Sequence, residues 1–116
     1  MGIAEGEMKL IELEPEFVTN ASPRSHMSMD SRVLTPDAQG ILFLCPYCFK
    51  RNAGPIGTHS ILVFFKDRGV PAECEPLPRW NVQGNSFDDL TISPSIDLGP
   101  DDWHGFVTNG EIVGGI

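Results

Sequence analysis

Cys45 and Cys48, separated by two residues in the motif CPYC, are the side chains in this sequence best suited to chemistry. On a tight turn after a strand, such a pair forms a knuckle whose two thiolates can bind one tetrahedral zinc ion at about 2.3 Å. Pro46 stiffens that turn, and the aromatic Tyr47 and Phe49 can shield the sulfurs. A structural zinc site needs two further ligands, and the sequence holds no second CxxC motif. The motif therefore predicts half of a zinc site.

The other ligands are expected among the histidines, the aspartates and the third cysteine. His104 is the first choice because it lies in a predicted terminal hairpin, and Asp101 precedes it by three residues, a spacing that can bring both side chains to one ion. His59, at the start of a long predicted strand, is the second choice. Cys74 lies in the loop PAECEP, where a surface thiol is an equal alternative. The predicted ligand set is Cys45, Cys48, His104 and Asp101, with His59 and Cys74 as alternatives.

Other interpretations of the motif receive less support. A thioredoxin-type redox pair needs a helix N-terminus that lowers the thiol pKa. Here Gly54 and Pro55 end any helix within two turns, and the surrounding βαβ pattern is absent. Two plain reduced cysteines remain an alternative. The adjacent acids Asp88 and Asp89 are typical of turns, and no P-loop, GxGxxG, HExxH or GxSxG motif occurs, so no catalytic residue is predicted.

Short apolar or alternating segments, separated by turn residues, must position the cysteines. The strands are predicted at GILFLC (40–45), HSILVFFK (59–66), RWNVQG (79–84), LTISPSI (90–96) and WHGFVTNGEIV (103–113). The proline in LTISPSI predicts an edge or a bulge. The Asn-Gly pair in the last segment predicts a hairpin turn. Strands at this spacing indicate a small antiparallel β fold.

The N-terminal third is less regular. The opening MKLIELEPEFV (8–18) predicts an edge strand or a short helix, and residues 19–37 are expected to be a loop or arm because they hold few large apolar side chains. The prediction is one mainly β domain, an antiparallel sheet or sandwich stapled by the CxxC motif, with an irregular N-terminal arm. Residues 1–38 form the strand and arm, and residues 39–116 form the metal-binding core.

The chain is acidic, with 16 Asp and Glu against 8 Lys and Arg, a formal net charge of −8 and a pI of about 4.6. Such a surface repels phosphate backbones, so nucleic acid is not the expected partner. No apolar segment approaches the ~18–20 residues of a membrane span, and the N-terminus lacks the pattern of a signal peptide. Three cysteines, two of them close together, favour a reducing compartment. A cytoplasmic protein without a membrane anchor is expected.

Six blocks, CPYCF, GPIGTHS, RGVP, RWNVQG, DLTISPSI and WHGFVTNGEI, together resemble small proteins of tailed phages and prophages related to the DUF6527 family of unknown function. The resemblance covers residues 39–113 and the opening MKLIELEPEF. It implies a bacterial host cytoplasm and a CxxC knuckle completed by a CxxH-like pair before the final hairpin. Carried over, these ligands are Cys45, Cys48, Asp101 and His104. Asp101 departs from the expected cysteine, but aspartate can ligate zinc through oxygen.

Some members of that family carry the label "ammonia monooxygenase", which the residues of this chain do not support. A copper or di-iron oxygenase needs a cluster of histidines or carboxylates, and this sequence has three scattered histidines. Larger relatives are associated with bacterial ubiquitin-like conjugation systems, which points to protein binding.

Three functions follow as expectations. The first is a phage-encoded accessory protein, a zinc-stabilised module that binds a host or phage protein. The second is an acidic inhibitor of a host defence or nucleic-acid enzyme, comparable to an anti-CRISPR protein, suggested by the net charge of −8. The third is a small zinc enzyme, which needs a coordination position open to water. The sequence favours the first, and it specifies neither the partner nor the oligomeric state.

Overall fold

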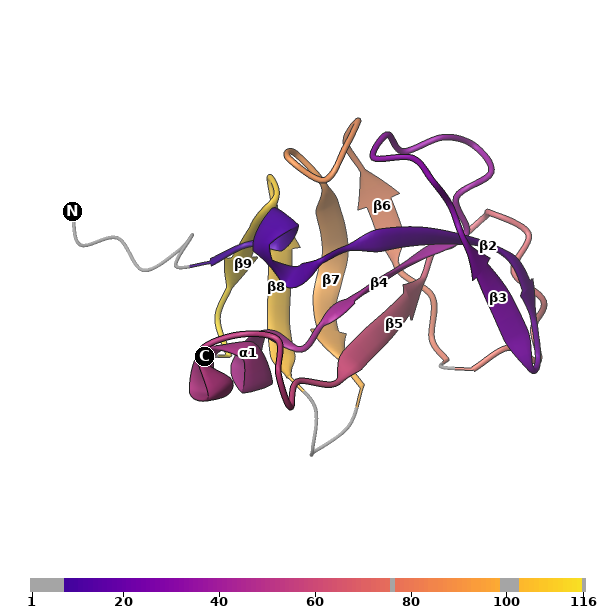
Figure 1. The fold of residues 1–116 in the computed structure, drawn as a ribbon. Coiled ribbons are helices and arrows are strands. Elements are labelled where there is room, and N and C mark those ends of the chain that lie inside the picture. The colour runs from indigo at the N-terminus through magenta and orange to yellow at the C-terminus, as the bar shows by residue number, and fades with distance from the viewer. Residues whose placement is uncertain (1–7, 76, 99–102, 116) are drawn as a thin grey trace.

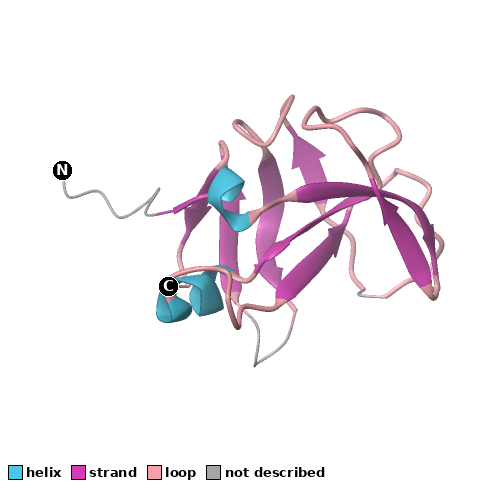
Figure 2. Cartoon of the chain, viewed as in Figure 1, coloured by secondary structure: helices cyan, strands magenta, loops and turns pink. Residues whose placement is uncertain are grey.

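The computed structural model describes residues 8–75, 77–98 and 103–115, which form two antiparallel sheets and two short helices (Figures 1 and 2). One sheet has the order β1–β9–β8–β7–β6, with bounds Met8–Lys9, Glu111–Val113, His104–Thr108, Thr91–Asp97 and Asn81–Gln83. The other has the order β3–β2–β4–β5, with bounds Ser25–Ser28, Glu16–Ser22, Gly40–Leu44 and Ser60–Phe64. The prediction of a small, mainly β domain is confirmed.

Strands β4 and β5 are the two most apolar segments, and they pair without a break. Their antiparallel register runs from Gly40 opposite Phe64 to Leu44 opposite Ser60. Because side chains alternate across a strand, Ile41 and Phe43 of β4 point to the same face as Ile61 of β5, toward the main core. The register therefore fixes which residues beyond Leu44 and Ser60 meet at the end of the pair.

The C-terminal hairpin follows from its turn residues. Strands β8 and β9 pair with Thr108 opposite Glu111, and the two residues between them have positive φ, 50° at Asn109 and 75° at Gly110. Two successive positive φ angles define a type I′ turn, which matches the twist of the flanking strands. The bulge predicted around the proline of LTISPSI also occurs, since the pairing of β7 with β8 shifts register between Ile92 and Ile96.

The N-terminal third is more regular than expected. Strand β1 lies at a sheet edge, a 3₁₀ helix covers Leu10–Leu13, and β2 and β3 form a hairpin where residues 19–28 were expected to be part of a loop. The composition of β3 did not indicate a strand because β3 is an exposed edge strand held by backbone pairing, and it buries no apolar face. Leu10, Leu13 and Phe17 are fully buried, so this third of the chain belongs to the core.

The main core lies between the two sheets, which are joined at one side. A parallel bridge links Phe65, just after β5, to Trp80, just before β6. Across the core, the rings of Phe43 and Trp103 pack edge to face with centroids 6.3 Å apart, and the Trp103 indole N–H donates to the Gly114 carbonyl at 2.9 Å. These contacts place the end of β4 against the start of β8.

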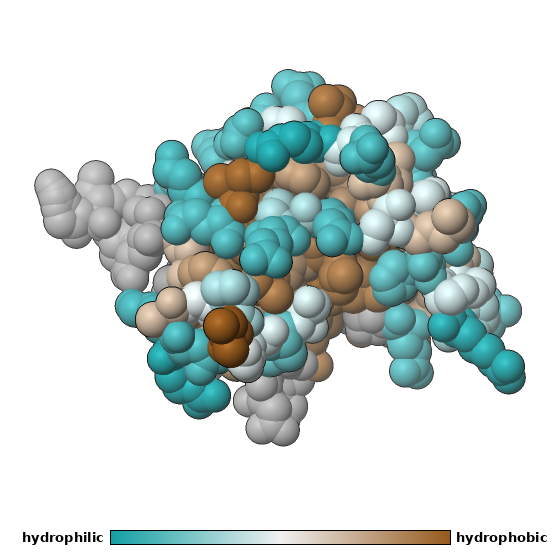
Figure 3. Space-filling view, in the orientation of Figure 1, coloured by the Kyte–Doolittle hydropathy of each residue, from teal (hydrophilic) through white to brown (hydrophobic). Residues whose placement is uncertain are grey.

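Several large apolar side chains are exposed on the surface. Figure 3 shows apolar residues scattered among hydrophilic ones on the face in view. Ile56, which follows the helix α1 (Pro46–Asn52), is 90% exposed, and Tyr47 within that helix is about half exposed. In the described part of the chain, no helix is long and apolar enough to cross a membrane.

Candidate metal centre

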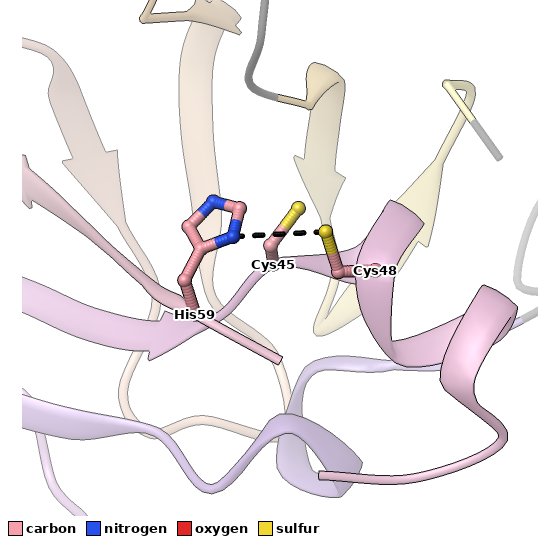
Figure 4. A group of neighbouring side chains, drawn as sticks. All are labelled: Cys45, Cys48 and His59. Atoms are coloured by element: carbon pink, nitrogen blue, oxygen red, sulfur yellow. Dashed lines mark hydrogen bonds between the residues drawn. The ribbon is translucent and has the colours of Figure 1, made fainter. Parts of the chain in front are cut away.

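Cys45, Cys48 and His59 form a group of potential metal ligands at one end of the main core (Figure 4). Their ligand atoms, two sulfurs and one imidazole nitrogen, all lie within 4.8 Å of one another. The Cys48 Sγ lies 3.6 Å from the His59 Nδ1. Cys45 is buried, Cys48 is half-buried and His59 is exposed, so the group extends from the core to the solvent.

The two cysteines are positioned by the junction between β4 and α1. Cys45 has an extended backbone and is the N-cap of the helix, and Pro46 occupies the first helical turn, where its fixed φ favours helix initiation. The Phe49 N–H donates to the Cys45 carbonyl at 2.9 Å and closes the first turn. This turn brings Cys48 back beside Cys45, so both thiols lie on the same side of the junction.

A helix beginning at Pro46, within CPYC, was not predicted, because a seven-residue helix is too short to show helical periodicity in the sequence. Gly54 and Pro55 end it within two turns, as expected. The structure places Cys45 at the N-terminus of this helix, as a thioredoxin-type pair requires, whereas the described strands form antiparallel sheets that contain no βαβ unit.

His59 reaches the cysteines through the register of β4 and β5. Leu44 lies opposite Ser60, so the next antiparallel pair is Cys45 opposite His59, and the Cys45 N–H donates to the His59 carbonyl at 2.8 Å. Directly opposed residues on one face of an antiparallel pair have Cβ atoms about 4.5–5.5 Å apart. The two side chains continue the inward-facing rows of their strands, with Cys45 buried in the main core and His59 exposed.

The loop that carries His59 is braced by its own hydrogen bonds. The Thr58 hydroxyl donates to the Gly54 carbonyl at 2.8 Å, and the Asn52 side-chain amide donates to the Thr58 oxygen at 3.1 Å. The Thr58 N–H also donates to the Pro55 carbonyl at 3.0 Å. These contacts hold the end of the loop that precedes His59 against the C-terminal end of α1. The position of His59 beside the cysteines therefore depends on hydrogen bonds within the protein.

The spacing of the donors suits a tetrahedral ion. With metal–sulfur bonds of about 2.3 Å and metal–nitrogen bonds of about 2.0 Å, tetrahedral angles place a sulfur about 3.5 Å from a nitrogen and two sulfurs about 3.8 Å apart. The observed sulfur–nitrogen distance of 3.6 Å is close to the first value, and the 4.8 Å limit on the whole group accommodates the second. The group could therefore hold a metal ion with little rearrangement.

The structure places the other predicted ligands apart from this group or does not describe them. Asp101 lies outside the described residues. His104 is exposed on β8, between the buried Trp103 and Gly105, and its Nε2 lies 3.4 Å from the Ser95 hydroxyl on the outer face of the sheet. Within the described ranges, His104 does not join the donor group.

Cys74 belongs to a separate environment. It is fully buried in a second apolar cluster with Val18 and Phe64, so it is not the surface thiol that its loop composition also allowed. Its backbone is held by a hydrogen bond from its N–H to the Pro71 carbonyl at 3.1 Å. Cys74 is therefore a core side chain, and the described donors narrow to Cys45, Cys48 and His59.

His59 was ranked below His104 on sequence grounds, although a usable pattern was present. If GILFLC and HSILVFF are aligned as an antiparallel pair with both apolar faces inward, Cys45 falls opposite His59. Choosing that register requires knowing that the two segments are partners and which of their faces is buried, and the sequence alone specifies neither.

Comparison of the chain with protein-family models, with curated proteins and with solved structures finds no match. The case for the site rests on its own geometry.

Proposed function

We propose that this chain is a zinc-stabilised protein-binding module, a phage-encoded accessory protein acting in the cytoplasm of a bacterial host. The donor group of Cys45, Cys48 and His59 carries the proposal, because it combines two thiols and an imidazole at distances that suit a tetrahedral ion. Thiolate and imidazole donors in that geometry favour zinc among the common metals. The phage origin and the host cytoplasm rest on the resemblance of the sequence blocks.

A stabilising role for zinc fits the size and build of the domain. A chain of 116 residues has a small core, and metal ligation contributes directly to the folding free energy of such domains. Cys45 directly follows β4, Cys48 lies in the helix α1, and His59 directly precedes β5. Zinc at this position would link the residue that follows β4 to the residue that precedes β5, at one end of the main core.

The partner is proposed to be a protein with a basic surface. The net charge of −8 disfavours nucleic acid and favours a positively charged partner. A groove with acidic side chains could receive this partner. One side is formed by the 3₁₀ helix and the start of β2, and the other by the segment after β3. Its lining includes the acidic residues Glu14, Glu16 and Asp30 and the apolar residues Ile11 and Met29, with Arg32 as its one basic residue.

The test measures metal and partner binding on the same preparations. Tag-free protein should contain about one zinc per chain by mass spectrometry. His59→Ala should lose it, whereas His104→Ala, a matched change of an exposed histidine on β8, should retain it. Loss of zinc in His104→Ala with retention of zinc in His59→Ala would show that His104, in the C-terminal hairpin, is the ligand. A parent protein purified without chelators that neither contains zinc nor takes it up would refute the metal site.

Protein binding is tested by capture from a bacterial lysate with zinc-loaded protein, followed by affinity measurement with each purified candidate. Glu14→Lys with Glu16→Lys should weaken a basic partner at least tenfold. Reversal at the exposed Glu73 and Glu75, which lie outside the groove, is the control. Equal weakening by both pairs would show that net charge alone, and not this groove, attracts the partner.

A further inference from the structure

We propose that β3 is a self-association surface, and that its occupant is β3 of a second copy of this chain, paired antiparallel across a two-fold axis at Met27. The inference goes beyond the proposed metal site and the acidic groove. It does not depend on the metal, because β3 and β5 form opposite edges of their sheet.

Strand β3 has one free edge. Among the strands of the described residues it pairs with β2 alone, and Figure 1 shows it at the outer end of its sheet. The Met29 N–H donates to the Phe17 carbonyl at 2.8 Å, so the backbone groups of Met29, and of Met27 two residues earlier, point toward β2. Those of His26 and Ser28 therefore point away from β2. Such an edge is a template for pairing with another strand.

The residues of β3 do not protect this edge. Native sheets commonly block a free edge with a lysine, a proline or a bulge in the edge strand. The strand SHMS has neither lysine nor proline, and the register shift between Thr19 and Ser22 leaves the extra residue in β2. Met27 is 58% exposed, so a partner strand would remove apolar surface from water.

The strand is self-complementary in one antiparallel register. With the axis at Met27, His26 lies opposite Ser28 of the second copy, and each such pair can exchange two backbone hydrogen bonds through its outward groups. The two Met27 residues then form the central pair without hydrogen bonds, in which opposed side chains lie closest. Each methionine therefore covers the other.

Charge complementarity favours a second copy as the occupant. In the same register Arg24, in the turn before β3, lies opposite Asp30 of the second copy, and the axis repeats this pair at the other end. A shift by two residues places either two histidines or Arg24 and Arg32 opposite each other, which is unfavourable for like charges. Residues 24–30 contain one Arg and one Asp, so this segment is spared the repulsion expected from a net charge of −8.

The experiment measures sedimentation of purified, tag-free, full-length protein at increasing concentration. Pairing along a four-residue strand buries much less than the ~1,200 Å² of a stable interface, so we expect a weak dimer with a Kd on the order of 100 μM. Met27→Lys should weaken dimerisation about tenfold, because it sets two like charges against each other at the axis. Ile56→Lys, a matched change at a residue that is 90% exposed outside β3, should leave the Kd unchanged.

Exchange of the flanking charges tests the register. Arg24→Asp or Asp30→Arg alone should weaken dimerisation about fivefold, because each sets like charges opposite each other at both ends of the pair. The double exchange should restore the Kd of the parent, since the complementary pairs and the net charge of −8 both return. Circular dichroism checks that each variant is folded.

Three results would overturn the inference. The first is a parent protein that remains monomeric at about ten times the expected Kd. The second is a dimer that survives Met27→Lys, and the third is a double exchange that does not restore the dimer. The last two would place the contact on another surface or in another register. None of these results bears on zinc content or on capture of a basic partner, so the proposed function would fail or stand separately.

Discussion

Replacing Cys48, a ligand in the proposed site, should abolish the stabilisation that zinc provides. Replacing Cys74, a buried cysteine outside the site, should not. Cys48→Ala deletes a half-buried ligand, and Cys74→Ala deletes a fully buried side chain in the second apolar cluster. The two substitutions are chemically identical, so their different responses to metal report on the site alone.

The size of the effect can be estimated from the site and the chain length. A zinc ion at the proposed site would join Cys45 to His59 across a segment of about 15 residues, and a covalent link closing a loop of that length is worth about 3 kcal/mol. Mass action gives a similar value, about 2.7 kcal/mol when free zinc is 100 times its Kd. With an unfolding entropy of about 2.1 cal/mol/K per residue, the 116-residue chain should gain about 11 °C in Tm.

The assay is thermal unfolding followed by circular dichroism, with chelator and then with zinc at 100 times the Kd of the parent protein. In chelator, Cys74→Ala should cost about 1 kcal/mol because it leaves a small cavity, and Cys48→Ala should cost less. In zinc, the parent and Cys74→Ala should both gain the full shift, and Cys48→Ala should gain almost none. An equal shift in Cys48→Ala would refute the assignment of that sulfur as a ligand.

Two further predictions concern the turns that frame the C-terminal sheet. Gly110→Ala should destabilise the protein by more than about 1 kcal/mol, because φ is 75° and the new Cβ would lie 2.3 Å from the Asp88 carbonyl. Gly114→Ala, with φ 81° and open space around it, should cost less in chemical denaturation, and an equal cost would argue against the clash. Asp89 accepts hydrogen bonds from the backbone N–H groups of Ser86 and Asn85. These bonds lower the pKa of Asp89 below the ordinary value of 3.8. Its stabilising contribution should therefore be complete above the unfolded-state pKa and be lost as the pH falls through the lower native value. NMR titration should show the lowered pKa. Asp89→Ala should lower the denaturation midpoint at pH 7 but not in strong acid, and a similar loss in Asp88→Ala would indicate a general charge effect.

Local sequence patterns predicted the parts of this protein that depend on neighbouring residues. The Asn109-Gly110 pair specified its turn because few residues accept two successive positive φ angles. The CPYC spacing brought two thiols together because residues three positions apart become neighbours when the chain makes one turn. Apolar runs located β4 and β5. Edge strand β3, by contrast, buries no apolar face and left no such pattern.

Tertiary structure determines which histidine joins the two cysteines as a candidate metal ligand. Pairing β4 with β5 in one register puts His59 opposite Cys45, and no local property of either residue specifies that register. His104 is directed away because Trp103 packs inward against Phe43, and alternation along a strand then turns the next side chain outward. The sequence by itself thus placed two cysteines close together as candidate metal ligands, while the pairing and packing of the strands decided which histidine lies beside them.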